Sequence, residues 1–269
     1  MTHAEKYFRR YLDISPLGVS LWRAVEAKHL ATVDLKRPIL DVGCGFGEFA
    51  QAFFDEPADM GLDIAPLDLY GAAKTRKYKN LILADARNMP FPKETFSTII
   101  SISTLEHIPQ PDRVLKEAYR ILKPNGKIIF TMETSKVVQG GAYRDVFNKI
   151  GLSRLSDIYE KRFNEFFNRK TLISREMWLI KIRKAGFVIE KSEDIISPTI
   201  TKLFDIFLLT SWPSQLFKPL FARRFVYRPK FLSDILVRIF LNILKDSDKD
   251  GTNLFVVARK PSQTVVDQK

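Results

Sequence analysis

A run of glycines follows a short apolar stretch and indicates a ligand-binding turn. Residues 39–50 read ILDVGCGFGEFA, so Gly43, Gly45 and Gly47 come directly after that stretch. Glycine costs stability in regular structure unless the backbone must turn sharply or let a group come close. In an open α/β sheet, ligands bind where a strand end turns into a helix. We therefore expect a ligand to lie against this backbone.

Two carboxylates flank the turn and indicate the kind of ligand. Asp41 lies beside the glycines, and Asp63 ends the next apolar stretch. A carboxylate about 20 residues after such a turn accepts hydrogen bonds from ribose hydroxyls. The spacing here is G-x-G-x-G rather than the G-x-G-x-x-G of dinucleotide folds, and Asp41 would repel a pyrophosphate. The pattern favours a ligand with a ribose and a cationic amine over a dinucleotide.

The elements around the turn alternate between strand and helix. Helices are expected at 46–54, 111–122 and 174–185, and residues up to 36 look helical with a break near 15–18. Strands are expected at 39–42, 60–64, 81–83, 96–102, 127–132, 187–196 and 252–258. Such alternation implies parallel strands joined by right-handed crossovers. The predicted fold is α/β, a doubly wound, mostly parallel seven-stranded Rossmann-like sheet with a helical lid and an insertion.

Breaks in the alternation divide the chain into expected segments. A basic, aromatic stretch after the fifth strand reads as a helical lid, and an apolar, basic stretch before the last strand reads as an insertion. The expected boundaries are 1–36 for an N-terminal helical cap, 37–135 for the ligand-binding core, 136–173 for the substrate lid, 174–196 for the returning helix and strand, 197–250 for the insertion, 251–260 for the last strand and 261–269 for a tail.

Three stretches together resemble a known family. ILDVGCGFGEFA, GLDIAP and LADARNMPFPKETFSTIISISTLEHIPQPDRVLKEAYRILKPNGKIIF are similar, in order and spacing, to class I S-adenosylmethionine-dependent methyltransferases. The resemblance is closest to the type 11 subgroup that includes the quinone-biosynthesis methyltransferases. It covers residues 38–135, the returning segment 174–196 and the last strand. It implies a methyltransferase (EC 2.1.1.-) with S-adenosyl-L-methionine as its cofactor.

The resemblance also implies roles for particular residues. Asp63 would bind the ribose hydroxyls, and Ser103 would lie near the methionine moiety. A cap of a helix or turn is the alternative for Asp85, and a small packing residue without thiol chemistry is the favoured alternative for Cys44. The amino-acid end of the cofactor would lie on Asp41, Gly43, Gly45 and Gly47, the adenine would lie on Asp85 and the Ala86 backbone, and Cys44 and Ile64 complete the expected cofactor site.

A general base is needed only if the methyl acceptor must lose a proton. His107 is the candidate, because it follows the fourth strand in STLEHI and has an unperturbed pKa near neutrality. The alternative is a histidine that caps the next helix or packs under the lid. Glu106 beside it is expected to be a structural contact. Four N-terminal residues either close over the cofactor or form a solvated helix face: Tyr7, Phe8, Arg10 and Tyr11.

The formal net charge of +12 is concentrated in the insertion. Residues 198–245 hold eight Lys or Arg against two Asp, with nine aromatic side chains. Apolar helices with a basic, aromatic flank are typical of segments at an anionic membrane surface. The alternative is a lid whose apolar face lines the pocket. One helix is expected to gather on one side Phe231, Leu232, Ile235, Leu236, Ile239, Phe240 and Ile243.

Two enzymatic readings of the acceptor follow, and two other readings are disfavoured. The first is a hydrophobic or lipid-linked small molecule; the alternative is a soluble metabolite or saccharide under a dry lid. A nucleic-acid methyltransferase is disfavoured, because the fourth strand ends in SISTLEHI without the Asn-Pro-Pro-aromatic tetrad of many base methyltransferases. A catalytically idle binding module is disfavoured by the intact set Asp41, Gly45, Asp63 and Asp85.

The compartment follows from cysteine content and hydropathy. There is one cysteine, so no internal disulfide forms, and the three histidines are too scattered for a zinc-type site, so no metal is expected. The charged start MTHAEKYFRR has no apolar core, and no stretch of about 18 apolar residues occurs. We expect a cytoplasmic protein without a secretory signal, with peripheral contact to the inner membrane face as an added feature.

Overall fold

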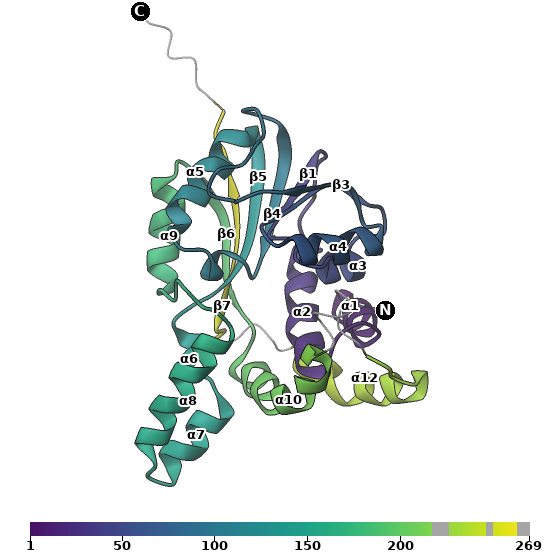
Figure 1. Cartoon of the computed structure of the whole chain (residues 1–269), viewed down its shortest axis with the longest axis vertical. Helices are drawn as coiled ribbons and strands as arrows, with labels where there is room; N and C mark the ends of the chain where they lie inside the picture. The colour runs from purple at the N-terminus through teal and green to yellow at the C-terminus, as the bar shows by residue number, and fades with distance from the viewer. Residues whose placement is uncertain (217–225, 246–249, 263–269) are drawn as a thin grey trace, which may run out of the picture.

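The computed structural model describes residues 1–216, 226–245 and 250–262. A twisted sheet lies between two layers of helices, and further helices gather beyond one end of it (Figure 1). The strands are β1 Ile39–Val42, β2 Ala58–Asp63, β3 Tyr78–Leu83, β4 Phe96–Ile102, β5 Leu122–Glu133, β6 Val188–Ile195 and β7 Asn253–Arg259. The helices are α1 His3–Leu12, α2 Leu17–Leu30, α3 Glu48–Phe53, α4 Pro66–Thr75, η1 Leu105–His107, α5 Pro111–Ile121, α6 Lys136–Gln139, α7 Ala142–Lys149, α8 Ser153–Phe166, α9 Arg175–Lys184, α10 Pro198–Leu216 and α12 Lys230–Lys245.

The sheet has seven strands in the order β3-β2-β1-β4-β5-β7-β6. The pairs β1–β2, β1–β4, β2–β3 and β4–β5 are parallel, whereas β7 runs antiparallel to both β5 and β6. Strand order reverses beside β1, which is the point where open α/β sheets bind ligands. This architecture confirms the predicted doubly wound, mostly parallel sheet.

Strand β5 differs from the sequence-based expectation. The run Lys-Pro-Asn-Gly at 123–126 predicts a turn before the strand, yet β5 already starts at Leu122. Leu122 pairs with Phe96 and Lys127 pairs with Thr98, so the four residues between them form a bulge. A bulge tolerates a proline that an unbroken ladder would exclude. The expected turn before the strand is therefore wrong: the signal at 123–126 marks a bulge inside β5.

The sheet is buried on both faces, as parallel sheets with helical crossovers are. One hydrophobic cluster joins the sheet to α1, α2 and α3, and it contains the fully buried Phe8, Leu21 and Ile100. The other joins the opposite face to α5 and α9, and it contains Leu115 and Trp178. All four residues of β1 are buried. The residues at the end of β1 are therefore held rigidly between two packed layers.

The helices of the insertion pack on the N-terminal helices. The rings of Trp22 in α2 and Phe204 in α10 lie 5.0 Å apart, and those of Phe8 in α1 and Phe240 in α12 lie 6.5 Å apart. The apolar residues that we expected on one side of α12 differ in their burial. Phe240 is buried, whereas Phe231 is 67% exposed and Ile239 is 59% exposed. Among the described residues, no helix combines the length and the hydropathy that crossing a bilayer requires.

Candidate functional site

A cleft of about 500 Å³ opens at the edge of the sheet where β1, β2 and β4 end. The candidate base His107 lines this cleft. Of the predicted cofactor residues, Gly47 alone is absent from the lining. The other predicted cofactor residues lie together along this cleft: Asp41, Gly43, Cys44, Gly45, Asp63, Ile64, Asp85, Ala86 and Ser103.

The glycines of the turn serve two purposes. Gly45 has a φ of +51° and lines the cleft, and a Cβ there would meet no atom of the described part of the chain within 4 Å. Gly47, at the start of α3, has a φ of +79°, and a Cβ there would lie 3.0 Å from the Cα of Ala72 in α4. Gly45 thus leaves backbone bare toward a ligand, whereas Gly47 lets two helices approach each other.

Asp63 ends β2 and anchors the glycine turn. Its Oδ2 accepts a hydrogen bond of 2.7 Å from the backbone N–H of Gly45, and its Oδ1 accepts one of 3.0 Å from the N–H of Ala65. A carboxylate has lone pairs for more than two donors. Asp63 can therefore hold the turn and still accept hydrogen bonds from a ligand in the cleft.

Asp85 follows β3 and has an arginine partner that we did not predict. The Arg87 guanidinium donates to Asp85 through Nη2 at 2.6 Å and through Nε at 3.0 Å. This hydrogen-bonded cation lowers the pKa of the Asp85 carboxyl. Arg87 also lines the cleft. The sequence LADAR contains the pair, but sequence spacing alone does not show that the two side chains face each other.

Ser103 lies in the cleft but its hydroxyl is directed to the N-terminal helices. Its Oγ donates to Oε1 of Glu26 at 2.5 Å, and Thr131 of β5 donates to the same oxygen at 2.7 Å. Glu26 is fully buried and also pairs with Arg23, which lines the cleft. These two residues of α2 were missed, because no local motif connects them to strands that are about 80 to 100 residues away.

His107 ends the short helix η1, directly after β4. Burial lowers the pKa of its imidazole, and the nearby Glu133 carboxylate acts in the opposite direction. Its Nδ1 is buried and has no hydrogen-bond partner among the residues that the structure describes. The imidazole is therefore neutral near pH 7, which is the form that can accept a proton.

Glu106, next to His107, has a structural environment. It is fully buried, and burial together with the neighbouring Glu133 carboxylate raises the pKa of Glu106 to about 8. Its backbone carbonyl accepts hydrogen bonds from Lys170 N at 2.8 Å and Thr171 N at 2.9 Å. Arg169 pairs with Glu133 on the other side, with Nη2 to Oε1 at 2.8 Å. The end of the segment 136–173 is thereby tied to the wall of the cleft.

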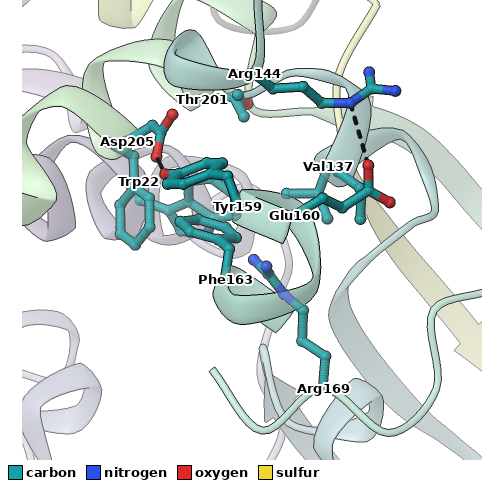
Figure 2. A pocket seen from close by; sticks show the side chains of 12 residues that line it. Trp22, Val137, Arg144, Tyr159, Glu160, Phe163, Arg169, Thr201 and Asp205 are labelled. Carbon is teal, nitrogen blue, oxygen red and sulfur yellow. Dashed lines mark hydrogen bonds and ion pairs between the residues drawn. The ribbon is translucent and has the colours of Figure 1, made fainter. Parts of the chain in front are cut away.

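A second pocket, of about 10 Å³, lies among side chains of α2, α6, α7, α8 and α10 (Figure 2). Trp22 and Arg169 line this pocket, whereas their sequence neighbours Arg23 and Asn168 line the cleft. The Tyr159 hydroxyl donates to Asp205, which connects α8 to α10. The aromatic side chains that line this second pocket are Trp22, Tyr159, Phe163 and Phe204.

The N-terminal aromatic residues do not close over the cleft. Tyr7 is buried and stacks on Phe53 of α3 at 5.3 Å. Arg10 pairs with Asp55 at 2.5 Å. Phe8 and Tyr11 are fully buried. Both expectations, a cofactor cover and a solvated face, are wrong for the three aromatic residues, since they attach α1 to the core, whereas Arg10 is 35% exposed.

Comparison with known proteins agrees with this geometry. Residues 40–130 match the family described as "Methyltransferase domain". The chain is 36% identical over 99 residues to a sterol 4-C-methyltransferase of Caenorhabditis elegans, covering 34% of this chain and 29% of that protein. It is 32% identical over 136 residues to a ubiquinone biosynthesis O-methyltransferase of Pseudomonas syringae, covering 47% and 55%. The chain thus spans about half the length of the ubiquinone relative.

The fold is shared with solved structures. A SAM-dependent methyltransferase of Thermotoga maritima aligns over 91% of both chains with a TM-score of 0.56 at 19% identity. Strands β2, β3 and β4 and the three carboxylates of the cleft lie within the matched residues 40–130. Residues 40–130 thus match a methyltransferase domain, and the fold of the chain is the one seen in a SAM-dependent methyltransferase.

Proposed function

We propose that this protein is an enzyme that methylates a hydrophobic or lipid-linked small molecule with S-adenosyl-L-methionine. The observation that carries the proposal is the cleft, where a bare glycine turn meets carboxylates from three strand ends. These residues fit that cofactor, because Gly45 leaves open space and the acids can accept from an amine, a ribose and an adenine. The bound cofactor supplies an activated methyl group.

The residues of the cleft have distinct proposed roles. Asp41 receives the cationic amine, and Asp63 accepts from the ribose hydroxyls while it holds Gly45. Asp85 and the backbone of Ala86 face the adenine. Gly43, Cys44 and Ile64 line the same cleft, and Ile64, at 63% exposed, offers an apolar surface. Ser103 acts indirectly, because its hydroxyl is engaged with Glu26.

His107 is the proposed base. It lines the cleft as a neutral imidazole, so it can remove a proton from an acceptor hydroxyl. The alignment of the acceptor and the exclusion of water are the other contributions that we assign to the protein. The helices of the segment 136–173 are the proposed lid for this purpose, above the core of 37–135.

Two observations favour a hydrophobic acceptor. The small pocket has four aromatic side chains beside four charged ones in its lining, and two pairs of consecutive residues divide between it and the cleft. The two relatives named above are, by their names, a sterol and a ubiquinone-pathway methyltransferase. A soluble metabolite or saccharide remains the alternative acceptor, with the segment 197–250 as part of a dry lid.

The exposed side of α12 supports peripheral contact with an anionic membrane. Phe231, Ile235 and Ile239 are each at least 45% exposed there, and the cations Lys230 and Arg238 are exposed beside them. An apolar stripe with basic neighbours binds such surfaces. Arg228 is part-buried and donates to the Leu12 carbonyl, so it does not contribute. Arg223 and Arg224, also expected to contribute, lie outside the described residues.

Calorimetry with S-adenosylmethionine and S-adenosylhomocysteine tests the cofactor. Incubation with cofactor labelled at the methyl group and a lipid-plus-metabolite extract then tests the acceptor. Label in an organic-soluble product supports the proposal, whereas label confined to water-soluble products favours the soluble acceptor. Cofactor binding without label in either fraction would favour a binding module.

A further inference from the structure

Asp41 receives a hydrogen bond from a residue two strands away. The Tyr78 hydroxyl, at the start of β3, donates to Oδ2 of Asp41 at 2.7 Å. Strand β2 lies between β1 and β3, so the tyrosine side chain must reach across β2. Burial raises the pKa of Tyr78 well above its ordinary value, so the hydroxyl keeps its proton and remains the donor.

Gly61 on β2 provides the space for this reach. It pairs with Asp41 on one side and with Leu81 of β3 on the other. A Cβ at Gly61 would lie 2.9 Å from Cδ1 of Tyr78 and 2.8 Å from Cδ2 of Leu81. A Cβ essentially never approaches other atoms that closely, so any larger residue would displace the ring. The Tyr78 ring can therefore occupy this position only because residue 61 is a glycine.

We propose that Tyr78, passing over Gly61, is the positioning residue that holds the Asp41 carboxylate toward the cofactor amine. Tyr78 does not line the cleft, so it acts through Asp41. One bond to Oδ2 leaves lone pairs of the carboxylate for a ligand. This inference rests on the proposed function, because it assigns Asp41 to an amine-bearing cofactor.

The surroundings of Asp41 make its ionisation sensitive to this bond. Burial raises the pKa of Asp41 to about 7, while Tyr78 and the Arg23 cation of α2 lower it and Asp63 of β2 raises it. The Cys44 thiol of the turn and the Tyr11 phenol of α1 also lie in this cluster, and burial keeps both protonated. Removing the Tyr78 hydroxyl should therefore raise the pKa of Asp41 further and weaken binding of a cation.

The test compares Tyr78→Phe with the unaltered protein in cofactor calorimetry at pH 7 and pH 8.5. We expect the variant to bind about tenfold more weakly at pH 7, the usual worth of a hydrogen bond to a charged group. At pH 8.5 the difference should shrink, because Asp41 is then largely ionised in both proteins. The cofactor's own amine titrates equally in both experiments, so it does not affect the ratio of the variant's dissociation constant to that of the unaltered protein at a given pH.

Two further variants separate positioning from a general loss of structure. Gly61→Ala should weaken binding in the same direction, and it should add little in the Tyr78→Phe background, because both changes remove the same bond. Tyr119→Phe is the matched control. Tyr119 packs on Phe187 at the opposite face of the sheet. The cofactor affinity of Tyr119→Phe and its pH dependence should therefore equal those of the unaltered protein.

Carboxyl-selective NMR of the ligand-free protein gives a readout that does not need the cofactor. The pKa of Asp41 should be higher in Tyr78→Phe than in the unaltered protein, and equal values would overturn the inference. Equal pH dependence of cofactor affinity in the two proteins would overturn it too. Failure of the unaltered protein to bind the cofactor would instead overturn the proposed function, while the NMR comparison still decides whether Tyr78 controls Asp41.

Discussion

The Arg23 guanidinium lies 2.7 Å from the Glu26 carboxylate, one turn further along helix α2. Glu26 is fully buried and also accepts hydrogen bonds from Ser103 and Thr131. This carboxylate therefore joins the N-terminal helices to the ends of β4 and β5, while Arg23 lines the cleft. The pair couples the stability of the N-terminal helices to the shape of the site.

Removing Arg23 should be more harmful than removing the whole pair. Arg23→Ala leaves a buried carboxylate without its cation, and we expect the free energy of unfolding to fall by about 2 kcal/mol. In the double variant Arg23→Ala, Glu26→Gln, the neutral amide oxygen can still accept from Ser103 and Thr131. Urea unfolding should then show the double variant to be more stable than Arg23→Ala alone. The opposite order would contradict a stabilising charge pair.

Asp63→Ala should lower cofactor affinity about 100-fold, because the backbone N–H groups of Gly45 in the turn and of Ala65 after β2 lose their acceptor together with a ligand contact. Calorimetry measures this loss directly. Asp59→Ala is a matched control on the same strand, since Asp59 also accepts from a backbone N–H, that of Ile39, but lies outside the cleft. Equal loss of affinity in both variants would argue against a ligand contact at Asp63.

His107→Ala should lower turnover by about 100-fold or more while cofactor affinity changes little, as expected for a lost base. Burial lowers the pKa of His107 below the ordinary histidine value of 6.5. Activity should therefore be kept as the pH falls to 6.5 and should decrease only when the pH falls through the lowered pKa of His107. Rate measurements from pH 5 to 8 check both statements. The exposed His3 of α1 provides the control, as His3→Ala should be fully active.

The Ile235→Ser, Ile239→Ser double variant should lose binding to anionic vesicles by at least about tenfold, because two exposed apolar side chains of α12 no longer enter the interface. Flotation at low and high salt measures it, and salt should weaken binding of the unaltered protein. Met177→Ser is the control, because it removes an apolar side chain of α9 that is as exposed as Ile235, and vesicle binding should not change. If the unaltered protein stays with the soluble fraction, α12 serves only as part of the lid.

Glu106→Gln should stabilise the protein increasingly as the pH rises. The folded-state pKa of Glu106 is raised to about 8, above that of an ordinary glutamate. Its contribution to stability is therefore greatest below about pH 4.5 and is lost as the pH rises through 8. Thermal unfolding of both proteins at pH 5 and pH 9 checks this. We expect a gain of about 1–3 kcal/mol at pH 9 relative to pH 5; a difference independent of pH would contradict the burial effect.

The strand ends and their acids could be predicted because one rule governs them. In a parallel sheet the carboxyl ends of the strands meet at one edge, so Asp41, Asp63 and Asp85 converge although they are far apart in the chain. The glycine turn carries its signal locally. These features needed only spacing and hydropathy, and the cleft contains all three carboxylates.

The partners of those acids could not be predicted in the same way. Tyr78 reaches Asp41 across an intervening strand, and Glu26 reaches Ser103 from a helix near the start of the chain. Such contacts depend on side-chain direction in the folded sheet, which periodicity does not reveal. The helix α1 was misjudged for the same reason, since its aromatic residues pack on α3 rather than over the cleft.

Strand β7 lies between β5 and β6 and is antiparallel to both. During synthesis on the ribosome, β5 and β6 cannot pair with β7 until residues 253–259 have emerged. Until then, the backbone N–H and C=O groups of β5 and β6 that face β7 in the sheet have no strand to pair with. A nascent chain of this protein thus passes through a long aggregation-prone interval. We expect its yield in cells to depend on chaperones that shield those edges until the final strand arrives.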